Sequence, residues 1–338
     1  MFLWDGFVRS ATTAGGTVAR ILAADIGGTN SRFGFFESGP GAALTLRHTI
    51  WLHTKQAGSF GDLLVMLRDA HFPVAAREVD IAVVAVAGPV LEGRRSAPPF
   101  IDWEIDFTRA EAEFGFRRHL LINDFVAQAF ATISPAAASA RPILAGRPLV
   151  GAARAVIGAG TGLGQAALLP DGRGGHLAVP SEGGHAEFPF VGEDEAALGE
   201  FLRRDLGVPA VTSTMVVSGA GVANVHRYLT GSPATPEEAT AGLVEGSQAL
   251  AWGARFYGRA CKLYALHAAA FGGLFVAGGI AARTPGLLAH AEFEREFRTS
   301  QDMADRLREI PVWLVSDQES GLWGAALLGA QTLAGVVA

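Results

Sequence analysis

Hydrophobic residues recur along the chain with two different spacings. A near-continuous apolar run at 80–87 and a short apolar run at 274–277 are typical of strands buried on both faces. Apolar residues at helical spacing lie at 60–70. The alternation of the two patterns predicts an α/β fold. Strands are expected at 21–37, 44–51, 80–87, 119–122, 155–169, 176–180, 274–277 and 312–315, and helices at 60–70, 108–114, 125–133, 193–206, 219–229 and 238–270.

The same order of elements occurs twice, which indicates two lobes of related architecture. A length of 338 residues predicts about two domains of ordinary size. The Ala- and Pro-rich segment 135–151 is expected to connect the lobes. The expected division is an N-terminal extension at 1–20, a small α/β domain at 21–135 plus 320–338, and a large α/β domain at 136–319.

Two glycine-rich turns are the most informative motifs of the sequence. Asp25-Ile-Gly-Gly-Thr-Asn30 and Gly158-Ala-Gly-Thr-Gly-Leu-Gly164 each lie between two apolar runs, so both are expected to be strand–turn–strand hairpins. Glycine lets the backbone approach a ligand closely, and exposed N–H groups in such turns bind anions. One hairpin in each lobe predicts a polyphosphate bound from both sides. Neither a P-loop nor a dinucleotide fingerprint is present.

Composition excludes several other classes of protein. A net charge of −6 without a basic block argues against a nucleic-acid partner. Cys261, the only cysteine, precludes an intrachain disulfide; we expect a small buried core residue in a reducing, cytoplasmic compartment. Two segments lack charged residues, 263–282 and 320–338. Their glycines favour a helix end with a buried strand in the first and a buried C-terminal helix in the second, so no membrane span is expected.

Asp124 is the strongest catalytic candidate. It lies where a short strand ends and a helix begins, and ligands of open α/β sheets bind at the carboxyl ends of strands. The helix dipole favours the ionised carboxylate, which suits an acceptor for a hydroxyl proton. Asn123 or Asp124 acting only as a helix N-cap is the alternative, and the two roles are compatible.

Polar residues form a second cluster at 181–187. Glycines between Glu182 and His185 let the two side chains converge on a small polar guest such as a polyol. A plain polar turn and a metal site that includes Glu187 are the alternatives. Asp25, which heads the first hairpin, offers a hard oxygen that suits Mg²⁺ through water, or it serves only to form the turn.

The motifs together resemble the bacterial glucokinase family of the hexokinase and actin-like ATPases. The resemblance extends from about residue 21 to the C-terminus and implies a two-lobed ribonuclease H-like (actin/hexokinase-type) α/β fold with an inter-lobe cleft. The motifs that carry it, in family order, are 25–32 (DIGGTNSR), 87–90 (AGPV), 121–125 (LINDF), 158–164 (GAGTGLG), 182–185 (EGGH), 218–222 (SGAGV) and 275–280 (FVAGGI).

The resemblance also implies an activity and roles for individual residues. It implies ATP- and Mg²⁺-dependent phosphorylation of a hexose, most simply glucose to glucose 6-phosphate, by a homodimer. Asp124 would be the base that deprotonates the sugar 6-hydroxyl, and Asn123, Glu182 and His185 would bind sugar hydroxyls. The cofactor-binding residues would be Asp25 (with Mg²⁺), Gly27, Gly28, Thr29, Asn30, Gly160, Thr161, Gly162, Gly219, Gly221, Gly278 and Gly279.

The chain departs from the family pattern at two places. Thr214 occupies the position of a second sugar-binding Glu, four residues before the Ser-Gly-x-Gly turn. Pro99-Phe100 replace the Thr-Asn that precedes Trp103 in the family. These changes leave open a kinase for a different hexose, or a sugar-binding regulatory protein with little or no catalysis. A polymerising actin-like ATPase is a third possibility, which the Glu182 and His185 pair disfavours.

Overall fold

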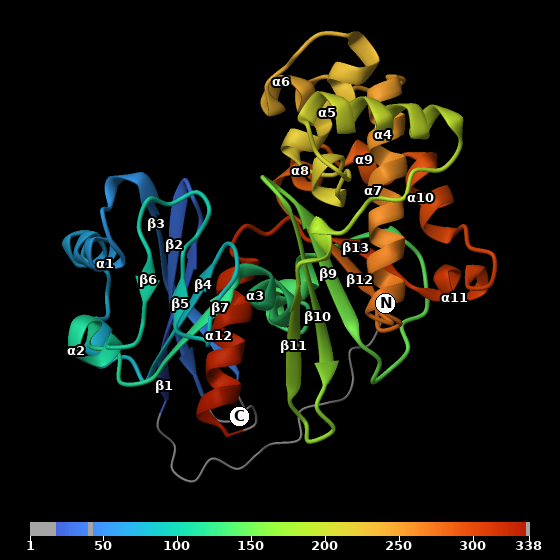
Figure 1. Cartoon of the computed structure of the whole chain (residues 1–338). Coiled ribbons are helices and arrows are strands. Elements are labelled where there is room, and N and C mark those ends of the chain that lie inside the picture. The colour runs from blue at the N-terminus through green and yellow to red at the C-terminus, as the bar shows by residue number, and fades with distance from the viewer. Residues whose placement is uncertain (1–17, 40–42, 336–338) are drawn as a thin grey trace. The chain divides into compact units, whose positions relative to one another are not determined.

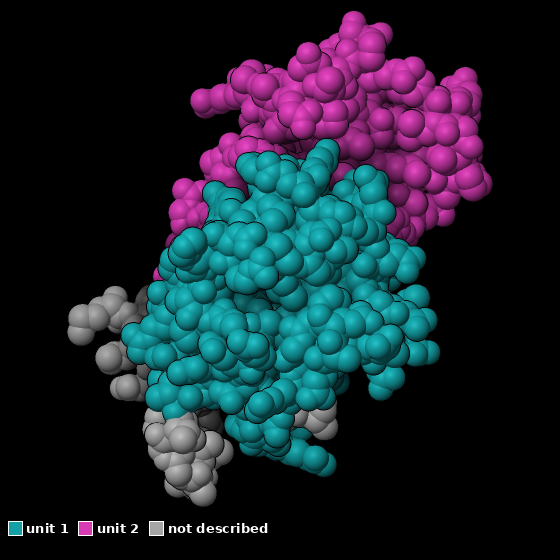
Figure 2. Space-filling view, turned by 90° about the vertical axis from the view of Figure 1, so that its left-hand side faces the viewer, with its two compact units in different colours: residues 1–136, 171–177, 318–338 teal, residues 137–170, 178–317 magenta. Residues whose placement is uncertain are grey.

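The computed structural model describes residues 18–39 and 43–335. The chain divides into two compact units (Figure 2). Unit 1 comprises Met1–Ala136, Asp171–Leu177 and Gln318–Ala338, and unit 2 comprises Ala137–Pro170 and Ala178–Asp317. The expected N-terminal extension lies outside the described residues up to position 17, and the first strand begins at Ala19. In the described part of the chain, no helix combines the length and the apolar character that a membrane span requires.

Unit 1 is built on a five-stranded sheet with the order β3-β2-β1-β4-β7 (Figure 1). The strands β1, β2 and β3 form an antiparallel meander, and β4 and β7 then continue the sheet parallel to β1. Every residue of β4 is buried, as its continuous apolar run predicts. The bounds are β1 Ala19–Ile26, β2 Asn30–Ser38, β3 Leu44–His53, β4 Ile81–Val86 and β7 His119–Asn123, with a separate pair formed by β5 Arg95–Ser96 and β6 Ile105–Asp106.

Helices cover both faces of this sheet. On one face, Phe60 of α1 packs with Phe107, Phe114 and Phe116 over the β1 side chains that begin at Leu22. On the other face, the uncharged C-terminal helix α12 packs on β1, β4 and α3, which confirms its prediction as a buried helix. The unit 1 helices are α1 Phe60–Asp69, α2 Ala110–Phe114, α3 Asp124–Ala131 and α12 Ser320–Leu333.

Unit 2 contains strands of a six-stranded sheet with the order β11-β10-β9-β12-β13-β8. Here too an antiparallel hairpin, β9–β10, is followed by parallel strands. The segment 135–151 also contains a strand that the sequence did not predict, because β8 pairs antiparallel with β13. Its Pro142 is tolerated because β8 is an edge strand. The bounds are β8 Arg141–Leu144, β9 Arg154–Ala159, β10 Leu163–Pro170, β11 His176–Ser181, β12 Leu274–Ala277 and β13 Val312–Leu314.

Local capping sets the helix boundaries of unit 2. The predicted helix at 238–270 is in fact two helices, since the chain turns at Gly246 (φ 78°) and Ser247 Oγ then accepts a hydrogen bond from Leu250 N–H to begin α7. Cys261 of α7 is fully buried, as expected. The helices are α4 Glu193–Leu206, α5 Gly219–Thr230, α6 Pro236–Ala241, α7 Gln248–His267, α8 Gly279–Arg283, α9 Gly286–Ala289, α10 Ala291–Arg298 and α11 Ala304–Glu309.

Candidate functional site

The first glycine-rich turn joins β1 and β2, so the predicted hairpin is confirmed. The turn is closed by Gly27 N–H, which donates to the Asn30 carbonyl at 3.0 Å. Thr54 fixes it from outside, because its hydroxyl donates to the Gly27 carbonyl at 2.7 Å and its N–H donates to the Thr29 carbonyl at 3.0 Å. A Cβ on Gly28 would lie only 2.6 Å from Phe100 Cβ, so the turn requires glycine at this position.

Asp25 lies directly opposite Arg32 in the β1–β2 register. Arg32 Nη1 donates to Asp25 Oδ2 at 2.9 Å, and the guanidinium lies 4.3 Å from the centre of the Trp51 ring. Burial raises the pKa of the Asp25 carboxyl, and the charge of Arg32 opposes the rise. The sequence motif at 25–32 includes Arg32, but we predicted no role for it. Its pairing with Asp25 could have been predicted, because an acid and an arginine stand on opposite strands of one tight hairpin.

Asn123 and Asp124 follow β7 at the carboxyl edge of the unit 1 sheet. Register pairing aligns Ile26, Val86 and Asn123 across β1, β4 and β7, so the first hairpin and Asp124 lie at the same edge. Asn123 caps α3 through its Oδ1, which accepts from Phe125 N–H at 2.9 Å. Its amide donates to the Gly88 carbonyl at 2.9 Å.

Asp124 itself occupies the first position of α3. Its Oδ1 accepts from Phe125 N–H at 3.0 Å, and the side chain is partly exposed. Asn123 is thus the N-cap of α3, and the Asp124 carboxylate accepts a backbone hydrogen bond in the first turn while it stays partly exposed.

The second glycine-rich turn joins β9 and β10 and is also a hairpin. Gly160 N–H donates to the Gly162 carbonyl at 2.9 Å. Gly219, at the start of α5, donates its N–H to the Gly160 carbonyl at 2.9 Å. Gly278, at φ 89°, follows β12 against β9, where a Cβ would lie 2.6 Å from the Ala159 carbonyl. Three segments expected to contact a nucleotide thus meet within unit 2.

The Glu182 and His185 cluster is arranged around the backbone of Leu163. Both side chains are exposed, and His185 Nε2 lies 3.8 Å from Glu182 Oε2 on one short turn. A Cβ on Gly184 would lie 2.1 Å from the Leu163 carbonyl oxygen, which explains the Gly-Gly sequence. On the same residue, Leu163 N–H donates to Thr214 Oγ1 at 3.3 Å. The structure therefore brings the turn that carries Glu182 and His185, and Thr214, to the backbone of Leu163 at the start of β10.

Glu187, considered as a metal ligand with His185, lies at an isolated backbone β-bridge to Thr212. The described residues contain no group of three or more His, Cys, Asp or Glu side chains that could hold a metal ion.

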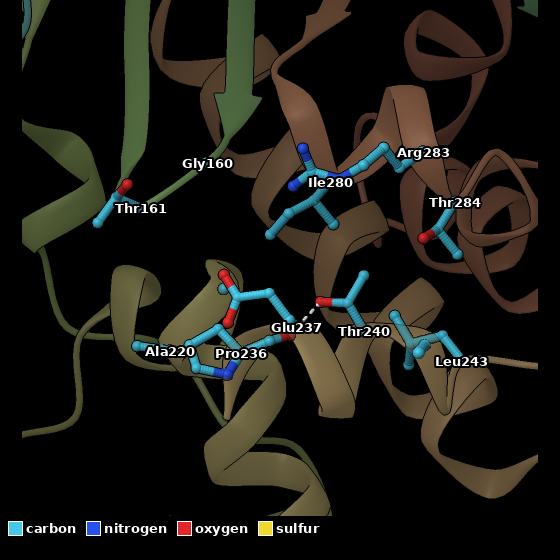
Figure 3. Close-up of a pocket in the computed structure, with 12 residues that line it drawn as sticks. Gly160, Thr161, Ala220, Pro236, Glu237, Thr240, Leu243, Ile280, Arg283 and Thr284 are labelled. Atoms are coloured by element: carbon cyan, nitrogen blue, oxygen red, sulfur yellow. Dashed lines mark hydrogen bonds between the residues drawn. The ribbon is translucent and has the colours of Figure 1, made fainter. Parts of the chain in front are cut away.

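A cavity of about 760 Å³ opens beside the second hairpin in unit 2 (Figure 3). Of the predicted nucleotide residues, Gly160, Thr161 and Gly219 line it, whereas Gly162, Gly221, Gly278 and Gly279 do not. Sequence reasoning missed Glu237 and Arg283 in its wall, which come from separate helices without a shared motif. The other lining residues are Ala220, Pro236, Thr240, Ala241, Leu243, Ile280 and Thr284.

Comparisons with known proteins match nearly the whole chain. The family model described as glucokinase matches residues 22–332. A glucokinase of Nostoc sp. is 32% identical over 345 residues, which span 92% of this chain and 99% of that protein. The crystal structure of a glucokinase from an Antarctic psychrotroph is 28% identical, covers 91% of this chain and 98% of its own, and superposes with a TM-score of 0.78. A glucokinase of Balamuthia mandrillaris in complex with glucose shares the fold at a TM-score of 0.74 and 19% identity, with coverage of 93% and 94%.

Proposed function

This chain belongs to the glucokinase family, and we infer that it transfers the γ-phosphoryl group of ATP to a hydroxyl of a hexose, with glucose as the first substrate to test. The observation that carries the inference is the placement of Asp124 at the carboxyl edge of the unit 1 sheet, beside a glycine hairpin that can bind phosphate. Phosphoryl transfer depends mainly on positioning and electrostatics, and both require groups held in this way.

Asp124 acts as the general base in this proposal. Its place in the first turn of α3 and the hydrogen bond from Phe125 N–H fix the pose of the carboxylate, which accepts the proton of the attacking hydroxyl in this proposal. A base of this kind typically contributes about 10²–10⁴-fold to the rate. Asn123 is locked by its contacts with Gly88 and Phe125, so its amide offers a fixed point for orienting the sugar.

The two hairpins, with the residues named at 25–30 and 160–162, bind the ATP phosphates, and Gly219, Gly221, Gly278 and Gly279 flank the adenosine. The N–H groups of Gly27 and Gly160 close the turns themselves, so the N–H groups of Gly28, Thr29, Thr161 and Gly162 are the phosphate donors in this proposal. Asp25 suits Mg²⁺, because Arg32 contacts only Oδ2 and leaves Oδ1 without a hydrogen bond among the described residues. Mg²⁺ commonly takes one or two carboxylates together with water and substrate phosphates. When bound, the ion supplies neutralisation of the charge that develops on the phosphates.

Glu182 and His185 bind hydroxyls of the hexose. Their exposed, converging side chains combine an acceptor with a group that both donates and accepts. Thr214 adds only a hydroxyl, and that hydroxyl already accepts from Leu163 N–H. Binding of the sugar therefore relies on fewer charged hydrogen bonds than the family pattern provides. We also expect the protein to be cytoplasmic and to form a homodimer. Analytical ultracentrifugation would measure the mass of the assembly.

The test is a coupled assay of ADP release with glucose, mannose, fructose and N-acetylated hexoses. We expect turnover with at least one hexose, and loss of that turnover in Asp124→Ala with sugar affinity largely kept. Asp69→Asn is the control, since Asp69 forms an exposed ion pair with Arg68 at the end of α1. Turnover by Asp124→Ala near the wild-type rate would refute the base. No turnover with any hexose would favour a sugar-binding protein without catalysis.

A further inference from the structure

Two oppositely charged side chains face the cavity of unit 2 from opposite walls. Figure 3 shows the Glu237 carboxylate extending from α6 and the Arg283 guanidinium extending from α8, over Ile280, into the space between them. Neither side chain makes a hydrogen bond or an ion pair with the part of the chain that the structure describes. Unpaired charges are ordinary on a convex surface, but here both point into a concave space of about 760 Å³. That volume is within the range of small-molecule sites, roughly 300–1,000 Å³.

The cavity has two chemically different ends. Gly160 and Thr161 of the second hairpin form one end, together with Gly219 at the start of α5. The N–H groups of Gly160 and Gly219 are bonded within the protein, so this end offers an anion the N–H groups of Thr161 and of Ala220 in the first turn of α5. Leu243 and Thr284 lie at the other end, which combines an apolar side chain with a hydroxyl. Such a gradient fits a nucleotide whose phosphates lie at the hairpin and whose base lies beside Leu243.

Glu237 lies between these two ends in Figure 3. A carboxylate there would repel phosphate oxygens, so its position corresponds to an uncharged part of the ligand. The ribose joins phosphates to base, and its 2′ and 3′ hydroxyls are two neighbouring donors. A carboxylate is an acceptor with two oxygens and suits such a pair. Arg283 packs against Gly279 on the facing wall, where its charge favours an anionic ligand overall.

We propose that Glu237 accepts hydrogen bonds from the ribose hydroxyls and thereby selects ribonucleotides over 2′-deoxyribonucleotides. The proposal rests on the proposed function, since it takes the cavity as the nucleoside part of the ATP site. Hydrogen bonds to a charged group change affinity by about tenfold to a hundredfold. Discrimination of that size between ADP and 2′-deoxy-ADP is therefore expected from this one side chain.

The experiment measures the dissociation constants of MgADP and Mg-2′-deoxy-ADP by calorimetry, with no sugar present. We expect the wild type to bind ADP at least about tenfold more tightly than the deoxynucleotide. Glu237→Ala should bind ADP more weakly but 2′-deoxy-ADP about as well, so that the ratio of the two dissociation constants falls below about threefold. The ratio for Glu237→Gln should lie between those of the wild type and Glu237→Ala. Glu245→Gln is the control, because Glu245 is exposed in the next loop and does not line the cavity.

Three results would overturn the proposal. They are an unchanged ratio of dissociation constants in Glu237→Ala, an equal loss of affinity for both nucleotides in a folded variant, and no binding of ADP by the wild type. Because no acceptor sugar is needed, a protein that binds ADP selectively but phosphorylates no hexose would contradict the proposed function and not this one.

Discussion

The phenolic oxygen of Tyr257 accepts a hydrogen bond from Ala159 N–H at 3.1 Å. The same oxygen lies 3.5 Å from the Ala277 carbonyl, to which its proton points. Ala159 is the last residue of β9 before the second hairpin, and Ala277 is the last residue of β12 before Gly278. Tyr257 is fully buried on α7, and burial raises the pKa of its hydroxyl, so it stays a neutral donor and acceptor. One side chain thus ties together two segments that we assign to ATP.

Tyr257→Phe should therefore affect both stability and nucleotide binding. The change leaves Ala159 N–H buried without its partner, which costs about 1–3 kcal/mol of unfolding free energy. We expect KM for ATP to rise several-fold while kcat changes little. Urea unfolding and steady-state kinetics measure the two effects. Tyr264→Phe on the same helix is the control, because no side-chain hydrogen bond of Tyr264 is found in the described residues; an equal effect there would exclude a specific role for Tyr257.

Thr214→Glu should tighten binding of glucose. The new carboxylate would lie beside Glu182 and His185, at the position where the family pattern has an acid. The substitution removes one long hydrogen bond, which Leu163 N–H donates to the Thr214 hydroxyl. A charged hydrogen bond is worth about 1.5–3 kcal/mol, so KM for glucose should fall about tenfold to a hundredfold. Thr214→Gln supplies similar length without charge. Equal KM values in the Glu and Gln variants would show that a negative charge at this position does not strengthen the binding of glucose.

Glu195 should make the stability of unit 2 depend on pH. It is buried on α4 and bonded to Arg259 through both carboxylate oxygens. Burial tends to raise its pKa, but the hydrogen bonds from Arg259 and Val191 N–H and the nearby arginines hold the pKa below its ordinary value of 4.5. A lowered folded-state pKa stabilises the fold above pH 4.5, and this contribution is lost as the pH falls through the folded-state pKa.

Glu195→Ala should accordingly cost about 3–5 kcal/mol at neutral pH, because it leaves Arg259 buried with only part of its partners. The difference from the wild type should shrink below pH 4.5. Denaturant unfolding over a pH series measures it. Glu200→Ala, which breaks exposed ion pairs on the same helix, should cost at most about 1 kcal/mol. A cost for Glu195→Ala that does not vary with pH would contradict the role of its charge.

Features encoded over a few neighbouring residues could be predicted from the sequence. Both glycine hairpins, the start of α3 after its N-cap Asn123, and α4 with its stop at Gly207 follow from turn, cap and stop residues that lie next to the elements they define. The edge strand β8 could not be predicted in this way. It has four residues, includes Pro142, and exists because β13, far along the chain, offers it a partner.

Contacts that depend on tertiary packing could not be predicted from the sequence either. Arg32 stands opposite Asp25 in an obvious hairpin, but its stacking on Trp51 requires the register of β3 as well. Glu237 and Arg283 belong to helices more than forty residues apart, and only packing around the second hairpin brings both to one cavity. When the side chains that line a site come from separate helices, no local spacing of residues in the sequence predicts the site.

Gly324→Ala should destabilise unit 1 by steric overlap, since its added Cβ would lie 1.8 Å from the Ala127 carbonyl oxygen and 2.7 Å from Ala131 N. Overpacking of this kind costs about 1–3 kcal/mol, and α3 would have to move away from α12 to relieve it. Because Asn123 and Asp124 begin α3, kcat should fall together with the midpoint of thermal unfolding. Gly61→Ala in α1 is the matched control: its Cβ meets only ordinary contacts, so removing a helical glycine should be neutral or stabilising by up to about 1 kcal/mol. Calorimetry and the coupled assay on both variants measure the two effects. A Gly324→Ala protein as stable and active as Gly61→Ala would mean that α12 and α3 adjust without displacing Asp124, the base that we propose.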